Sequence, residues 1–148
     1  MTIIVDTNIV FSGILNSSSK IGKILLNAKV HFQFYSCDFL RVELIKHKDK
    51  LLHLTKLSEE ELSELENLIT GNITFINEGL IPVEIIKSTE ILLQNIDCKD
   101  TPFVALARHL GAKLWTGDLK LIRGMNAKKI KNVISTAELS LLMDELEE

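Results

Sequence analysis

Short, mostly apolar runs alternate with longer amphipathic segments along the chain, and this alternation restricts the fold more than any other feature. The candidate strands are 2–5, 32–35, 73–76, 113–116 and 132–134. The candidate helices are 21–28, 38–47, 58–69, 83–94, 100–110 and a last one that Ser135 caps. Apolar strands that alternate with helices predict an α/β fold, a three-layer α/β/α sandwich around a central, mostly parallel sheet.

Length and composition are those of an ordinary globular chain. The 148 residues predict a single domain, 1–148. A chain that is 46% hydrophobic and 25% charged is neither disordered nor fibrous. Asp6 interrupts the first apolar run too early for a secretory signal, and no run approaches the ~20 residues of a membrane span. We therefore expect a cytoplasmic protein with no membrane contact.

Charge and cysteine content exclude some kinds of site. The formal net charge of −3 gives no global positive field for a nucleic acid. The segment 120–131 has five basic residues, and a local strip of this kind can bind phosphates, although a solvated surface is the plainer interpretation. Cys37 and Cys98 lie far apart without CxxC spacing, which predicts buried or half-buried thiols and no zinc site or disulfide.

Acidic residues follow two of the candidate strands. Asp6 comes directly after 2–5, and Asp118 comes just after 113–116. Ligands of open α/β sheets bind beyond the carboxyl ends of the strands, which favours a functional role for both. Either residue can instead cap a helix or form a turn. Thr7 and Asn8 favour the functional interpretation of Asp6, because a hydroxyl and an amide can orient a carboxylate or a bound water.

Glu43 and Asp100 are candidates for the same place. On a helix over 38–47, in which Asp38 suits the N-cap, Glu43 falls between Phe39 and Leu40 on the apolar side. A buried, unpaired carboxylate costs several kcal/mol, so this glutamate calls for a cationic partner.

Asp100 has the position of an N-cap for the helix that follows, yet an N-cap aspartate keeps one oxygen that can reach a cleft. Asp97 is a weaker candidate nearby. Carboxylates that converge at one end of a sheet repel one another, and a hard divalent cation removes that repulsion. Ligation by oxygen alone suits Mg²⁺ or Mn²⁺ better than zinc. Such a cation can activate water against a phosphodiester.

Other common sites are missing from the sequence. The four histidines show no HExxH spacing, and neither GxGxxG nor GxxxxGK[ST] occurs.

Four segments resemble the motifs of the PIN-domain family, in the branch of toxins from toxin–antitoxin pairs. They occur in the family's order and span most of the chain. The segments are IIVDTNIVFSG at 3–13, FLRVEL at 39–44, DCKDTPFVALA at 97–107 and LWTGDLKL at 114–121. The resemblance implies the α/β/α fold and Mg²⁺- or Mn²⁺-dependent cleavage of RNA with one or two ions.

The resemblance also implies roles for particular residues. The family's catalytic metal ligands correspond to Asp6, Glu43, Asp100 and Asp118, and its supporting polar residues correspond to Asn8 and Thr116. Asp97 is kept as a further supporting residue. Where some relatives carry another acid, this chain has Lys120. Members of the family often dimerise and bind a small antitoxin protein, so both partners are expectations here.

Alternatives from other classes remain at this stage. A degenerate PIN-like module would keep the fold and bind RNA or a protein partner without turnover. A phosphoacceptor receiver domain needs paired acids after its first strand, whereas Val5 precedes Asp6. A phosphatase of the haloacid-dehalogenase type needs DxD, and Asn8 stands in place of the second aspartate.

Overall fold

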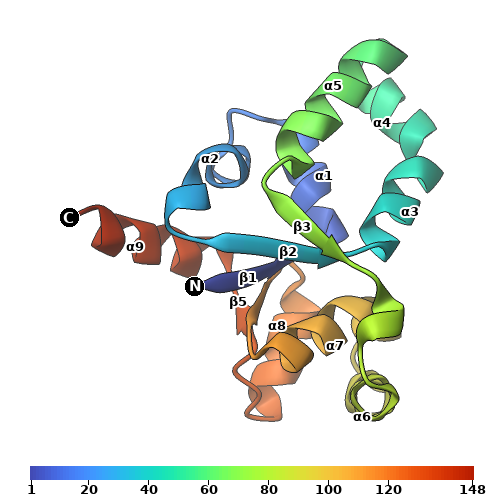
Figure 1. Cartoon of the computed structure of the whole chain (residues 1–148), viewed down its shortest axis with the longest axis vertical. Helices are drawn as coiled ribbons and strands as arrows, with labels where there is room; N and C mark the ends of the chain where they lie inside the picture. Colours follow the sequence, from blue (N-terminus) through green and yellow to red (C-terminus); the bar gives the residue numbers. More distant parts are fainter.

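The computed structural model describes residues 1–148 as a five-stranded sheet flanked by helices (Figure 1). The strands are β1 Thr2–Val5, β2 Gln33–Cys37, β3 Ile73–Ile76, β4 Lys113–Trp115 and β5 Val133–Ile134. Their order is β3-β2-β1-β4-β5, and every neighbouring pair is parallel. The predicted parallel α/β/α architecture is confirmed, so the carboxyl ends of all strands lie at one edge of the sheet.

Nine α-helices and three 3₁₀ helices connect the strands. The α-helices are α1 Thr7–Leu15, α2 Lys20–Asn27, α3 Phe39–Lys46, α4 Lys48–Thr55, α5 Glu59–Thr70, α6 Val83–Leu93, α7 Thr101–Leu110, α8 Leu119–Ala127 and α9 Thr136–Glu147. The 3₁₀ helices are η1 Ala28–Val30, η2 Glu78–Leu80 and η3 Cys98–Asp100. None of these helices combines the length and the apolar character that a membrane crossing requires.

The helices form two layers with the sheet between them (Figure 1). Helices α1 to α5 pack against one another on one side. Helices α6, α7 and α8 lie on the other side, where α7 packs against β1, β2 and β4. Helix α9 lies beside α2. We call α1 to α5 the upper layer and η3 with α6, α7 and α8 the lower layer, as they are drawn in Figure 1. The upper layer reaches the carboxyl ends of the strands through α1 and α3. The lower layer reaches them through η3, α7 and α8.

The central strands are buried on both faces, as their sequences predict. Ile3, Ile4 and Val5 of β1 are fully buried, and so is Trp115 of β4. Each such side chain stabilises the fold by about 1.5–3 kcal/mol relative to an exposed one. Ile4 pairs with Tyr35 on one side and with Leu114 on the other. The residues that follow β1 and β4 are thus held on rigid, adjacent strands.

Three helices, α1, α4 and α8, were missing from the sequence-based prediction. Helix α1 buries Thr7, Ile9, Val10, Gly13 and Ile14, so its sequence has no polar stripe and its apolar run continues that of β1. Helix α4 follows α3 with only His47 between them. His47 makes no side-chain capping bond, and no glycine or proline marks this junction.

Several local signals were correct. Ser58 with Glu61 and Ser135 with Glu138 form complete capping boxes at the starts of α5 and α9. Gly111 ends α7 in the left-handed conformation at φ 63°. Of the two free cysteines, Cys37 is buried as predicted, but Cys98 in η3 is exposed. Burial raises the pKa of the Cys37 thiol, with a further contribution from Glu78, and this disfavours the reactive thiolate form.

Candidate metal centre

A pocket of about 480 Å³ lies at the carboxyl ends of the central strands. Side chains from both helix layers line it. The lining residues are Asp6, Thr7, Asn8, Phe39, Glu43, Lys46, His47, Asp97, Lys99, Asp100, Phe103 and Asp118. The four acids predicted as metal ligands therefore share one cavity, although they are separated by more than half of the chain.

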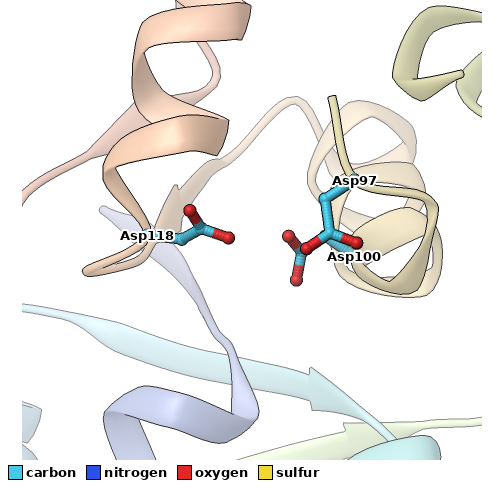
Figure 2. A group of neighbouring side chains, drawn as sticks. All are labelled: Asp97, Asp100 and Asp118. Atoms are coloured by element: carbon cyan, nitrogen blue, oxygen red, sulfur yellow. The ribbon is translucent and has the colours of Figure 1, made fainter. Parts of the chain in front are cut away.

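Three of the acids form the tightest group. Asp97, Asp100 and Asp118 each offer one oxygen, and these oxygens lie within 4.8 Å of one another. Figure 2 shows Asp118, at the start of α8, facing Asp97 and Asp100 across the pocket. Oxygen ligands bind Mg²⁺ or Ca²⁺ at about 2.0–2.6 Å, so two ligands of one ion can lie as far apart as twice that distance. The spacing is therefore compatible with one shared ion.

Asp6 is the most deeply buried acid of the site, with an exposed fraction of 2%. Its Oδ1 accepts a hydrogen bond of 2.9 Å from the Ile9 amide, and this bond caps α1. The pKa of Asp6 is raised from 3.8 to about 6, chiefly by burial and to a smaller extent by the charges of Asp118 and Glu43. Hydrogen bonds from Thr116 and from the Ile9 amide partly oppose this rise. Asp6 thus combines a capping role with a place in the acidic pocket.

Asp118 also caps a helix. Its Oδ1 accepts a hydrogen bond of 3.2 Å from the Leu121 amide at the start of α8. Its own amide donates to the hydroxyl of buried Thr116, at 3.1 Å. Thr116 therefore stands behind the pocket and fixes the turn between β4 and α8, while its side chain also contacts Asp6.

Asp100 does not cap α7 through its side chain, so this part of its prediction was wrong. Its backbone is already in a helical conformation, at φ −84° and ψ 0°, which is not the extended conformation of a side-chain N-cap. Its Oδ2 is buried and has no hydrogen-bond partner. Burial, followed by the charges of Asp97, Asp6 and Asp118, raises the pKa of Asp100 to about 7. A buried oxygen without a partner is destabilising, and a cation would satisfy it.

Glu43 lies in the same pocket but outside the tight group of three aspartates. Its Oε1 accepts a hydrogen bond of 2.5 Å from the hydroxyl of Thr7 in α1. This contact crosses from one helix to another and fixes the carboxylate at the wall of the pocket. The sequence-based placement of Glu43 beside Phe39 is consistent with this geometry, since both side chains line the pocket.

Helix α3, which carries Glu43, is capped by a residue that lies far from it in the sequence. Asp38 precedes the helix as predicted, but its side chain makes no capping bond. Instead, Oε1 of Glu78 in η2 accepts a hydrogen bond of 2.6 Å from the Phe39 amide. Nothing in the local sequence around α3 pointed to Glu78, because the bond joins residues that are far apart in the chain.

The remaining predicted positions also lie at the site. Asp97 was the weaker candidate, yet it belongs to the closest group, and its Oδ1 accepts a hydrogen bond of 3.0 Å from the Lys99 amide. Asn8 is exposed and lines the pocket. The roles assigned to all of these residues remain predictions.

Three basic side chains that the sequence analysis did not select also line the pocket. Lys46 and His47 follow Glu43 by three and four positions, which places them on the same side of the helix, and Lys99 lies in η3. The helical wheel of α3 could have identified the first two. None of the basic residues of 120–131 lines the pocket.

Comparison with known proteins gives the family and the fold. A family model described as PIN domain matches residues 4–138. The crystal structure of VapBC2 from Rickettsia felis, bound to a DNA fragment from their promoter, has a similar fold with a TM-score of 0.68. The match covers 91% of this chain and 97% of that chain at 17% identity. No curated protein matches the chain at a significant level.

Proposed function

Because the chain belongs to the PIN-domain family, we propose that it is a divalent-cation-dependent endoribonuclease that hydrolyses RNA phosphodiester bonds. The observation that carries this proposal is the acidic pocket, and within it the buried Oδ2 of Asp100 that has no partner. Every acidic donor is a carboxylate oxygen, which suits Mg²⁺ or Mn²⁺. The donors therefore fit one or two such ions.

Each residue has a proposed task. Asp97, Asp100 and Asp118 would hold the cation, together with Asp6 and Glu43 from the other side of the pocket. When bound, Mg²⁺ or Mn²⁺ polarises a phosphate oxygen and lowers the pKa of water, which is the chemistry that phosphodiester hydrolysis requires.

Neighbouring side chains would keep the carboxylates in place. Thr7 orients the Glu43 carboxylate through its hydroxyl, and Thr116 orients the turn that carries Asp118. Asn8, exposed at the rim of the pocket, is suited to hold water or substrate.

We further propose that the enzyme acts as the toxin of a toxin–antitoxin pair in the cytoplasm. Support comes from the sequence resemblance to the toxin branch of the family and from the fold shared with VapBC2. Its partners would be an RNA substrate, a small antitoxin protein and a second copy of the chain. Induced expression in bacterial cells tests this role: the wild-type chain is expected to arrest growth, and Asp100→Asn is not.

The enzymatic proposal is tested with purified protein and a fluorescently labelled RNA. Cleavage is expected with Mn²⁺ or Mg²⁺ and none with EDTA. Asp100→Asn should lower the rate by about 100-fold or more, because it weakens a ligand of the cation. Asp49→Asn is the matched control, since Asp49 is an exposed acid of α4 that does not line the pocket.

Two results would contradict the proposal. One is cleavage by Asp100→Asn at the wild-type rate. The other is Mn²⁺ binding by calorimetry without cleavage of any RNA, which would identify the chain as the degenerate binding module.

A further inference from the structure

The acidic pocket raises a question about its substrate. Five carboxylates line it, and a phosphodiester backbone carries one negative charge per nucleotide. The chain as a whole has a formal net charge of −3, so no global field compensates for this repulsion. Positive charges at the pocket itself would offset this repulsion where the backbone has to approach the acids.

Lys46 and Lys99 are the lysines that line the pocket. Lys46 is the last residue of α3, in the upper helix layer, and Lys99 lies in η3, in the lower layer. Lys99 stands between Asp97 and Asp100 in the chain, and its amide donates to Asp97. Each helix layer thus contributes one ammonium group to the pocket.

Neither ammonium group is paired with a carboxylate. The ion pairs of the structure are His31 with Glu147 and Lys48 with Glu59. Lys46 and Lys99 therefore have no carboxylate oxygen within 4.0 Å, although five carboxylates share their pocket. Both side chains are exposed. Their charges are consequently available to an incoming anion.

We infer that Lys46 and Lys99 bind the phosphate groups of a single-stranded nucleic acid and thereby bring its backbone to the acidic centre. The inference rests on the proposed function and names the residues that recognise its substrate. The pocket has a volume of about 480 Å³ and lies between the two helix layers. The half-buried ring of Phe39 lines the same pocket, and unstacked bases can stack on aromatic rings.

The test measures binding of a short, fluorescein-labelled, single-stranded RNA of mixed sequence by anisotropy. The buffer contains Ca²⁺, and a gel confirms that the RNA stays intact. Lys46→Gln and Lys99→Gln are each expected to weaken binding by about fivefold. Each should also reduce the slope of log affinity against log salt by about 0.7.

Matched variants separate a phosphate contact from a general effect. Lys46→Arg and Lys99→Arg keep the charge and should bind within about twofold of wild type. Lys120→Gln should bind as wild type, because Lys120 is an exposed lysine two residues after Asp118 that does not line the pocket. Single-stranded DNA of the same sequence should show the same fold losses, since the phosphates are common to both. A loss confined to RNA would overturn the assignment to phosphate.

The Mn²⁺ affinity of the lysine variants should not fall together with their RNA affinity. Removing a positive charge from the pocket should leave Mn²⁺ binding unchanged or tighter, whereas a damaged pocket would bind both RNA and Mn²⁺ more weakly. The inference would be overturned if Lys46→Gln and Lys99→Gln lost affinity for both RNA and Mn²⁺. It would also be overturned if they bound RNA as well as Lys120→Gln does. If RNA binding depends on the lysines but no cation supports cleavage, the enzymatic proposal fails and this one stands. If cleavage depends on Asp100 but neither cleavage nor RNA binding depends on the lysines, the enzymatic proposal stands and the inference about the lysines fails.

Discussion

Asp6 offers the most quantitative test of the acidic pocket, because its substitution should stabilise the protein while it damages the site. The pKa of Asp6 is raised from 3.8 to about 6, chiefly by burial. A pKa that is higher by about 2 in the folded state corresponds to about 3 kcal/mol. The folded chain binds its proton more tightly than the unfolded chain does. Stability is therefore lost as the pH rises from 3.8 to 6, and the full loss is present above pH 6.

Asp6→Asn removes this penalty and keeps an acceptor for the Ile9 amide, so the cap of α1 can survive. In EDTA at pH 8, the variant should be more stable than wild type by about 1 to 3 kcal/mol, where the upper value is the whole penalty. Near pH 4, where Asp6 of the folded wild-type chain is mostly protonated, the difference should fall to about 0.5 kcal/mol. Urea denaturation at both pH values measures it.

Mn²⁺ should narrow the difference in stability between the variant and wild type, and reverse it where the variant's advantage is at the lower end of this range. An ion at 100 times its Kd stabilises the wild-type chain by about 2.7 kcal/mol, and Asp6→Asn should gain less because it lacks a charged ligand. The reasoning is refuted if the variant in EDTA at pH 8 is no more stable than wild type. It is equally refuted if the difference in stability is the same at pH 4 and at pH 8.

Three further predictions concern the site and the stability of the fold. Thr7→Val should weaken Mn²⁺ binding in calorimetry by about tenfold, because Glu43 loses the hydrogen bond that orients it; an unchanged affinity would contradict this role. Glu78→Ala should lower the free energy of unfolding in urea by about 1 kcal/mol, since it removes the cap of α3, whereas Asp38→Ala should change it little. The opposite order would contradict the structure. Gly22→Ala should cost about 1–3 kcal/mol in the same assay, because its Cβ would lie 2.4 Å from a backbone carbonyl oxygen; a neutral effect would show that this turn can move.

Much of the fold follows from signals that are local in the sequence. The boundaries of β1 and β3 were predicted to the residue, and the capping boxes marked the starts of α5 and α9. Helices α1, α4 and α8 were missed, and the reasons for α1 and α4 are opposite. Helix α1 is buried on several sides and so lacks a polar stripe, while α4 starts without any cap.

The candidate site was predicted less evenly. Asp6 and Asp118 could be selected because an acid after a buried parallel strand lies at the ligand-binding edge of a sheet. The prominence of Asp97 and the partnerless oxygen of Asp100 depend on how η3 turns toward α8, which no local pattern encodes. The capping bond from Glu78 likewise depends on the packing of η2 against α3.

The central place of β1 in the sheet has a consequence for how the chain folds during its synthesis. Its first neighbour, β2, follows soon after it, but Ile3 on its other edge pairs with Lys113. A ribosome adds about 5–20 residues per second, so β1 waits several seconds with one edge open. Asp118 emerges later still. A growing or interrupted chain that ends before β4 therefore carries Asp6, Asp97 and Asp100 but lacks Asp118, and the complete set of pocket acids is present only near the end of synthesis.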